Sequence, residues 1–122
     1  LIITADTIVW LDGEVMGKPV DDEDARRMLR ALSGKTHQVI TGVCLMTIDS
    51  QKAFATVTDV TFCHLSEEEI DYYVERYRPM DKAGSYGIQE WMGFVGVESI
   101  SGSYFNVMGL PNQRLYTELK KL

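Results

Sequence analysis

Residues 1–19, LIITADTIVWLDGEVMGKP, decide the fold, because they form an apolar strand that carries one carboxylate and ends in a tight turn. The residues on both sides of Asp6 are β-branched, aliphatic or aromatic almost without a break, which is typical of a strand covered on both faces. Asp12 and Gly13 then separate two apolar runs, and this dipeptide is the strongest short-range signal of a β-hairpin. The stretch therefore predicts a buried strand that folds back on itself.

Asp6 is the residue of this strand that needs an explanation. An ionised carboxylate in a half-buried strand destabilises the fold unless it is paired, hydrogen-bonded or bound to a metal. Asp6 is either a structural residue bonded to a nearby turn, or a general base or metal ligand at a strand end that faces a cleft. We favour the second interpretation, because Thr7 lies beside it. Lys18 precedes Pro19, a restricted position that suits a side chain held toward a fixed target as well as a solvated one.

A helix is predicted next over residues 20–32, with acidic residues in its first turn and Gly34 at the position of a left-handed cap. Lys35 either complements the negative end of this helix or contacts a phosphate, and the sequence favours neither. His37 has no second histidine or carboxylate at ligand spacing, which indicates a structural histidine.

Two long strands are predicted over residues 38–49 and 52–65, joined by a polar turn into an antiparallel hairpin. In the second strand the even-numbered residues 54–62 share one face, which we expect to be the more buried one. The run SEEE at residues 66–69 is a capping box that begins a helix ending near Tyr77.

Residues 80–90 fit neither a helical nor a strand period, and irregular segments often carry function. Lys82 either pairs with Asp81 at the surface or meets a phosphate in a cleft. The Gln89 side chain offers an amide donor and a carbonyl acceptor. Recognition of the imide edge of thymine or uracil requires both groups.

The last segments complete an α/β pattern. A strand is predicted over residues 94–100, a short helix over 104–108 and a final helix from Pro111. The residues of this final helix expected to face inward are Leu115, Tyr116, Leu119 and Leu122. No linker or internal repeat divides residues 1–122, so we expect one α/β domain with a mixed sheet, flanking helices and a cleft.

Composition and motifs exclude several classes of protein. The net charge of −6 argues against non-specific nucleic-acid binding, which relies on a basic surface. The apolar runs are too short to span a membrane and no signal-peptide pattern occurs, so we expect no membrane association and a cytoplasmic location. Nucleophile elbows and Walker loops do not occur either. The candidate groups left after these exclusions are acidic residues and lysines around a cleft. This set suits metal-assisted attack of water on a phosphate anhydride.

Several motifs occur in a fixed order: ADTIV before the hairpin, GKP after it, then SGKTHQVITGV, DKAGSYGIQ and GSYFNVMGLP. This arrangement resembles the Maf family of nucleoside triphosphate pyrophosphatases over essentially the whole chain. The resemblance implies a Maf/ITPase-like fold and cleavage between the α- and β-phosphates of a nucleoside triphosphate. It also implies a divalent cation, magnesium or manganese, as cofactor, and it leaves open whether the chain forms a homodimer.

The resemblance also suggests roles for residues that contact the phosphates. It implies that Asp6 is the general base or the metal ligand and that Lys18 contacts a phosphate. Lys35 and Lys82 are weaker candidates for phosphate contacts.

Substrate choice is implied by two further residues. Thr7 together with Gln89 resembles the branch of the family that prefers dTTP and UTP, with modified pyrimidine nucleotides as a related class. Glu90 departs from the family pattern, in which a small residue, usually Gly, is common.

Most Maf-like chains also have an earlier strand and a Ser-x-x-Arg loop upstream of the ADT motif. From this resemblance we expect residues 1–122 to be a carboxy-terminal portion that lacks both. The alternative function is that of a non-catalytic nucleotide-binding or septum-related regulatory protein.

Overall fold

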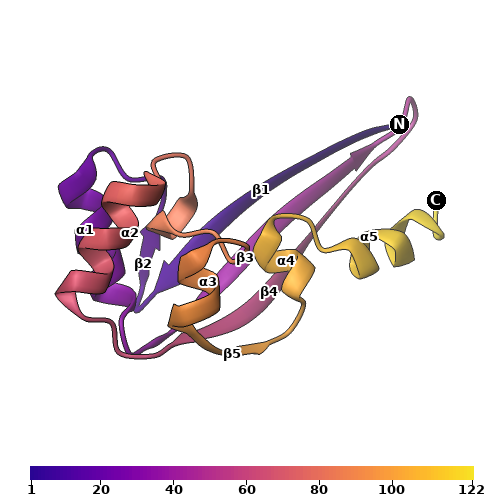
Figure 1. Ribbon diagram of the computed structural model, residues 1–122. Helices are drawn as coiled ribbons and strands as arrows, with labels where there is room; N and C mark the ends of the chain where they lie inside the picture. Colours follow the sequence, from indigo (N-terminus) through magenta and orange to yellow (C-terminus); the bar gives the residue numbers. More distant parts are fainter.

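The structure, a computed structural model, describes residues 1–122 and contains one five-stranded sheet in the order β2-β1-β3-β4-β5 (Figure 1). The strands are β1 (Ile2–Leu11), β2 (Glu14–Met16), β3 (Thr36–Met46), β4 (Gln51–Phe62) and β5 (Val97–Ser101). The α/β class with flanking helices is confirmed. The sheet differs from the predicted mixed one, because all four neighbouring pairs in this chain are antiparallel.

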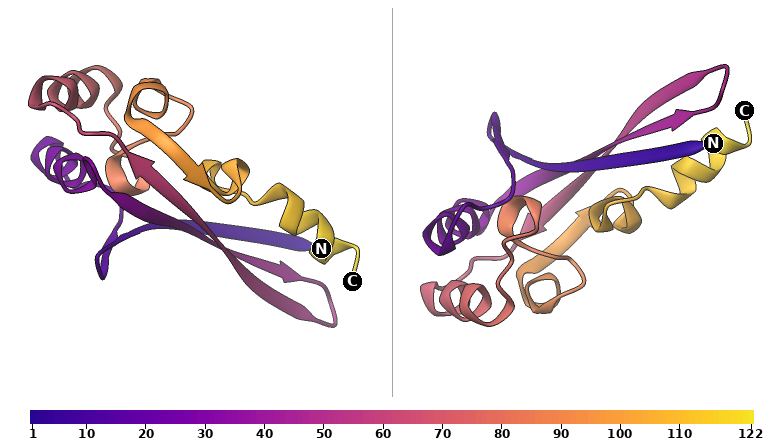
Figure 2. Two further views of the ribbon diagram at one scale, coloured as in Figure 1. Left: turned by 90° about the horizontal axis from the view of Figure 1, so that it is seen from below. Right: turned by 90° about the horizontal axis from the view of Figure 1, so that it is seen from above.

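Helices cover the sheet unevenly. They are α1 (Asp22–Leu32), α2 (Glu67–Tyr77), the 3-10 turn η1 (Ala83–Ser85), α3 (Trp91–Gly96), α4 (Tyr104–Met108) and α5 (Asn112–Leu119). Helices α1 and α2 lie side by side at one end, while β1, β3 and β4 extend from them as a long arm flanked by α4 and α5 (Figures 1 and 2). None of the helices is long and apolar enough to cross a membrane.

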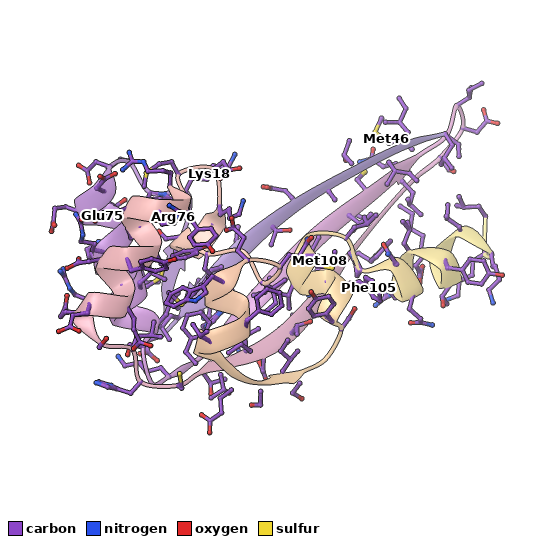
Figure 3. All side chains as sticks on the ribbon, viewed as in Figure 1. Lys18, Met46, Glu75, Arg76, Phe105 and Met108 are labelled. Carbon is purple, nitrogen blue, oxygen red and sulfur yellow. The ribbon has the colours of Figure 1, made fainter.

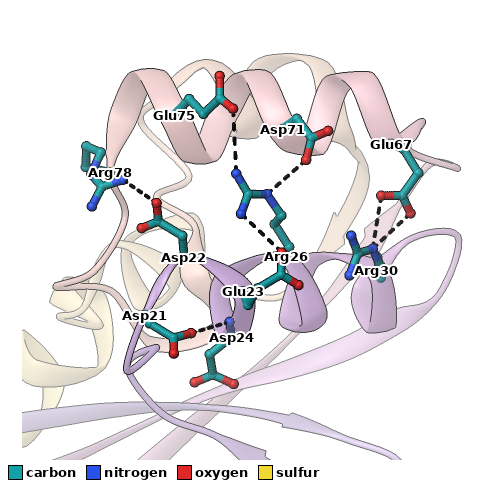
Figure 4. Close-up of polar contacts among 10 residues, drawn as sticks. All are labelled: Asp21, Asp22, Glu23, Asp24, Arg26, Arg30, Glu67, Asp71, Glu75 and Arg78. Carbon is teal, nitrogen blue, oxygen red and sulfur yellow. Dashed lines mark hydrogen bonds and ion pairs between the residues drawn. The ribbon is translucent and has the colours of Figure 1, made fainter.

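Local signals account for α1 and α2. The Asp21 side chain accepts a hydrogen bond from the Asp24 N–H at 2.8 Å, and Ser66 and Glu69 form the complete capping box. Ion pairs then join the two helices through Arg26, which lies 2.9 Å from Asp71 (Figure 4). A partly exposed pair of this kind contributes little on its own, so the packing of the two apolar faces holds the helices together.

The prediction that the leading strand is covered on both faces is wrong for its first half. Residues 2–6 are exposed, whereas Val9 and Leu11 belong to the core. The reason is the arm itself, because its far end carries the amino terminus and Met46 beyond the reach of α1 and α2 (Figure 3). In β4 the even-numbered face is the more buried one, as predicted.

Two predictions for the carboxy-terminal third also need correction. Phe94, within the predicted strand, lies in α3, and β5 begins only at Val97. In α5 the buried residue is Glu118, while Tyr116 and, beyond the end of the helix, Leu122 are exposed.

Glu118 is buried by the basic side chains around it. Its carboxylate pairs with Lys52 of β4 at 2.5 Å and with Arg114 and Lys121 at 3.3 Å. The hydrogen bond from Lys52 is the main cause that lowers the pKa of Glu118 to about 2. Helix α5 is thus attached to the arm by charge, which apolar periodicity does not reveal.

Candidate active site

Five of the six predicted site residues line one cavity of about 430 Å³. They are Asp6, Thr7, Lys18, Lys82 and Gln89. This volume lies within the roughly 300–1,000 Å³ typical of sites for small molecules. Residues more than eighty positions apart in the sequence therefore share one concave surface.

Three segments build this cavity around β1. Asp6 lies on the strand itself, Lys18 comes from the loop after β2, and residues 81–90 follow α2. Figure 3 shows Lys18 on its loop and Met108 on α4, which contributes the remaining wall. The Gly84 N–H donates to the Gly17 carbonyl at 3.1 Å, so the lysine-bearing loop and the irregular segment are directly joined.

Gly84 is required where the irregular segment meets β1. Its φ of +71° lies in the left-handed region, and a Cβ placed there would be 2.8 Å from a methyl carbon of Val9. A larger residue would therefore push the irregular segment away from the strand that carries Asp6.

The electrostatic setting of Asp6 differs from the one expected. Asp6 is exposed on the arm and not half-buried as predicted, so its carboxylate stays hydrated and needs no partner to remain ionised. The residues that line the cavity instead include two lysines together with Asp6, Asp81 and Glu90. Lys82 lies 3.4 Å from Asp81, an exposed pair that a polyanionic ligand can compete for.

Thr7 is part of a hydroxyl chain that leads away from the cavity. Its Oγ1 lies 2.9 Å from the Oγ1 of Thr41, which in turn donates to the Asn106 carbonyl at 3.2 Å. Since the Thr41 proton is used in this second bond, Thr7 donates to Thr41 and keeps its own lone pairs free to accept a hydrogen bond.

Lys35 is the predicted site residue that the structure does not bring to the cavity. Its Nζ lies 3.8 Å from Asp12 in the β1–β2 turn, at the end of the sheet. Asp81 and Glu90 also line the cavity, and their sequence pattern predicted no function for them. The only sequence signal for them was their position beside Lys82 and Gln89.

His37 supports the floor of the cavity from the core. It is 1% exposed, and its Nε2 lies 2.6 Å from the hydroxyl of Tyr86, a residue that lines the cavity. Burial lowers the pKa of His37 to about 4 and raises the pKa of Tyr86. The prediction of a structural histidine is confirmed.

The low pKa of His37 predicts a pH dependence of stability. The unfolded chain takes up a proton near pH 6.5 and the folded chain only near pH 4, so stability is complete above pH 6.5 and falls as the pH is lowered. Between pH 6.5 and 5 the loss from this group should reach about 2 kcal/mol. Urea unfolding across this range measures it, and His37→Gln should abolish most of the slope. An equal slope in both proteins would contradict the burial of a neutral histidine.

The acidic residues of the cavity are compatible with a divalent cation that is bound partly by the protein and partly by a phosphate ligand. No group of three or more His, Cys, Asp or Glu residues is arranged to hold a metal ion. Asp6 and Asp81 are nevertheless two acidic residues among those that line the cavity, and Mg²⁺ is usually bound by one or two carboxylates together with substrate phosphates. The residues therefore fit a cation that binds together with a phosphate ligand.

Comparisons with known proteins give one consistent answer. Residues 1–122 match the family described as Maf-like protein. The chain is 76% identical over 122 residues to a protein of Phocaeicola vulgatus, 67% identical over 122 residues to one of Bacteroides thetaiotaomicron, and 52% identical over 119 residues to one of Flavobacterium psychrophilum. All three relatives are named dTTP/UTP pyrophosphatase. The alignments cover 98–100% of this chain and 61–63% of each relative.

Proposed function

The chain belongs to the Maf family, and on this basis we propose that the full-length protein hydrolyses dTTP and UTP to the monophosphate and pyrophosphate. The observation that carries the proposal is that acidic residues, two lysines, Thr7 and Gln89 line one cavity.

The lysines act on the triphosphate. Lys18 and Lys82 lie on different segments of the cavity wall, so their ammonium groups can bind different phosphate oxygens. Such charge-assisted contacts are stronger than neutral hydrogen bonds, and they stabilise the negative charge that develops on the leaving pyrophosphate.

Asp6 acts on the water. Its exposed carboxylate can accept a proton from a water molecule that attacks the phosphate anhydride, and with Asp81 it would hold a magnesium or manganese ion. A bound cation would supply charge neutralisation to the phosphate oxygens.

Thr7 and Gln89 act on the base. The imide edge of thymine or uracil presents one N–H between two carbonyl oxygens. Thr7 keeps lone pairs that can accept from this N–H, and the Gln89 side-chain amide can donate to a carbonyl. Adenine and cytosine lack a ring N–H at this edge, and guanine presents its N–H beside a single carbonyl on a larger purine ring, so the two residues favour dTTP and UTP.

The products test the proposal. Incubation of the full-length protein with dTTP and Mg²⁺ should release dTMP and pyrophosphate in equal amounts. Chromatography measures the dTMP, and a pyrophosphate assay measures the second product. Release of orthophosphate would point to a different cleavage, and binding without turnover would favour the non-catalytic alternative.

Gln89→Ala tests the assignment of the base contact. Loss of the amide should reduce kcat/KM for dTTP and UTP by about tenfold or more, because the base carbonyl loses its donor, while the slow reaction with purine triphosphates should hardly change. Steady-state rates with dTTP, UTP, CTP, ATP and GTP measure both effects. A uniform fall for every nucleotide would instead mean that Gln89 only supports the loop.

A further inference from the structure

Helix α2 reaches the cavity through a single hydroxyl group. The ring of Tyr73 is fully buried and stacks on Tyr77 and Trp91, with centroid distances of 5.2 and 6.4 Å. Its hydroxyl donates to Glu90 Oε1 at 2.7 Å and accepts the Gly87 N–H at 3.1 Å. One phenol is therefore bonded to both ends of the segment 87–90.

That segment is a tight turn. The Glu90 N–H donates to the Gly87 carbonyl at 3.0 Å, which leaves Ile88 and Gln89 at the two central positions. Ile88 is buried in the core and Gln89 is exposed on the cavity. The direction of the Gln89 side chain thus depends on how firmly the ends of the turn are held.

Glu90 is the unusual member of this arrangement. Its carboxylate is partly buried in the cavity wall and makes no ion pair within 4.0 Å, although Lys82 lies on the same cavity. Its side chain has Tyr73 as its hydrogen-bond partner. Burial, together with the bond to Glu90, raises the pKa of Tyr73, so the phenol stays a donor to this carboxylate.

We propose that Tyr73 and Glu90 are positioning residues that set the preference for dTTP and UTP by fixing the 87–90 turn that presents Gln89. This inference rests on the proposed function. A binding group held in one orientation discriminates better than a mobile one, because ordering it on binding costs free energy. Loosening the turn should therefore weaken recognition of the base and leave the chemistry at Asp6 largely unchanged.

The test compares variants of the full-length protein on dTTP and ATP. Tyr73→Phe removes one oxygen and keeps the stacked ring, and Glu90→Ala removes the acceptor. Both should raise KM for dTTP by about tenfold, with kcat within about threefold of wild type and the reaction with ATP hardly changed. Glu90→Gln keeps an oxygen that can accept from the phenol, so it should restore most of the preference.

Tyr72→Phe is the matched control, since this neighbouring tyrosine is 48% exposed and its hydroxyl has no hydrogen-bond partner in the fold. It should behave as wild type. Unchanged dTTP preference in Tyr73→Phe and Glu90→Ala would overturn the inference while leaving the proposed function intact, as would an equal loss on both nucleotides. A wild-type protein that does not turn over dTTP would overturn the proposed function, and the inference with it.

Discussion

Replacing Asp6 by Asn in the full-length protein is expected to lower kcat with dTTP by at least about 10²-fold, the scale of a positioned base or metal ligand. The substitution keeps the shape of the side chain and removes its charge and basicity. Because Asp6 is exposed on the arm and contributes nothing to the core, the thermal unfolding midpoint should hardly change. Rapid-quench or steady-state kinetics, with calorimetry as the check on folding, measure the two quantities separately.

Asp59 provides a matched control for this prediction. It is also an acid on a strand of the same sheet, but it does not line the cavity. Asp59→Asn should therefore retain turnover close to wild type. Near-normal turnover of Asp6→Asn would end the assignment of Asp6, and equal losses in both variants would indicate a general effect of charge.

The second large effect is expected for Lys82→Met and Lys18→Met. Each change removes a charge-assisted contact to a phosphate, so the affinity for a non-hydrolysable dTTP analogue should fall by about tenfold or more, whereas thymidine should bind as before. Titration calorimetry with both ligands measures the difference.

Lys35→Met is the control for the two lysines, because Lys35 lies beside Asp12 and outside the cavity. It should leave both affinities unchanged. If Lys35→Met weakens the binding of the triphosphate analogue as much as Lys82→Met does, the ligand occupies a different surface from the cavity described above.

Local rules predicted the parts of the fold that depend on neighbours in the sequence. The Asp12-Gly13 turn, the capping box at Ser66 and the left-handed Gly34 all depend on a few adjacent residues, and the structure contains each of them. The exposure of the first half of β1 could not be predicted in this way. Its apolar composition is compatible with burial, and only the placement of the helices at the other end of the sheet leaves it uncovered.

The burial of helix α5 could not be predicted from local sequence patterns either. Its leucines suggest an apolar inner face, but the arm presents Lys52 to it, and the buried partner is the carboxylate of Glu118. Cross-chain pairing of this kind depends on which residues of β4 lie opposite the helix. Sequence periodicity within one helix carries no such information.

The candidate site was predictable as a set of residues but not as an arrangement. Motif resemblance selected five residues that the fold brings to one cavity, although their individual roles stay predictions. Lys35 was chosen for the same reason, yet it lies beside Asp12 of the β1–β2 turn and outside the cavity. The bonds from Tyr73 to Gly87 and Glu90 join segments 14 and 17 residues apart, and the helical spacing of Tyr73 indicated only a core residue.

The central proposal is that this cavity selects dTTP and UTP for cleavage to the monophosphate and pyrophosphate. Its most direct test is kcat/KM of the full-length protein for dTTP, UTP, CTP, ATP and GTP, with pyrophosphate and monophosphate measured together. We predict that dTTP and UTP exceed the other three by about tenfold or more, with one pyrophosphate per monophosphate. Equal rates for all five nucleotides, or a preference for the purines, would contradict the claim.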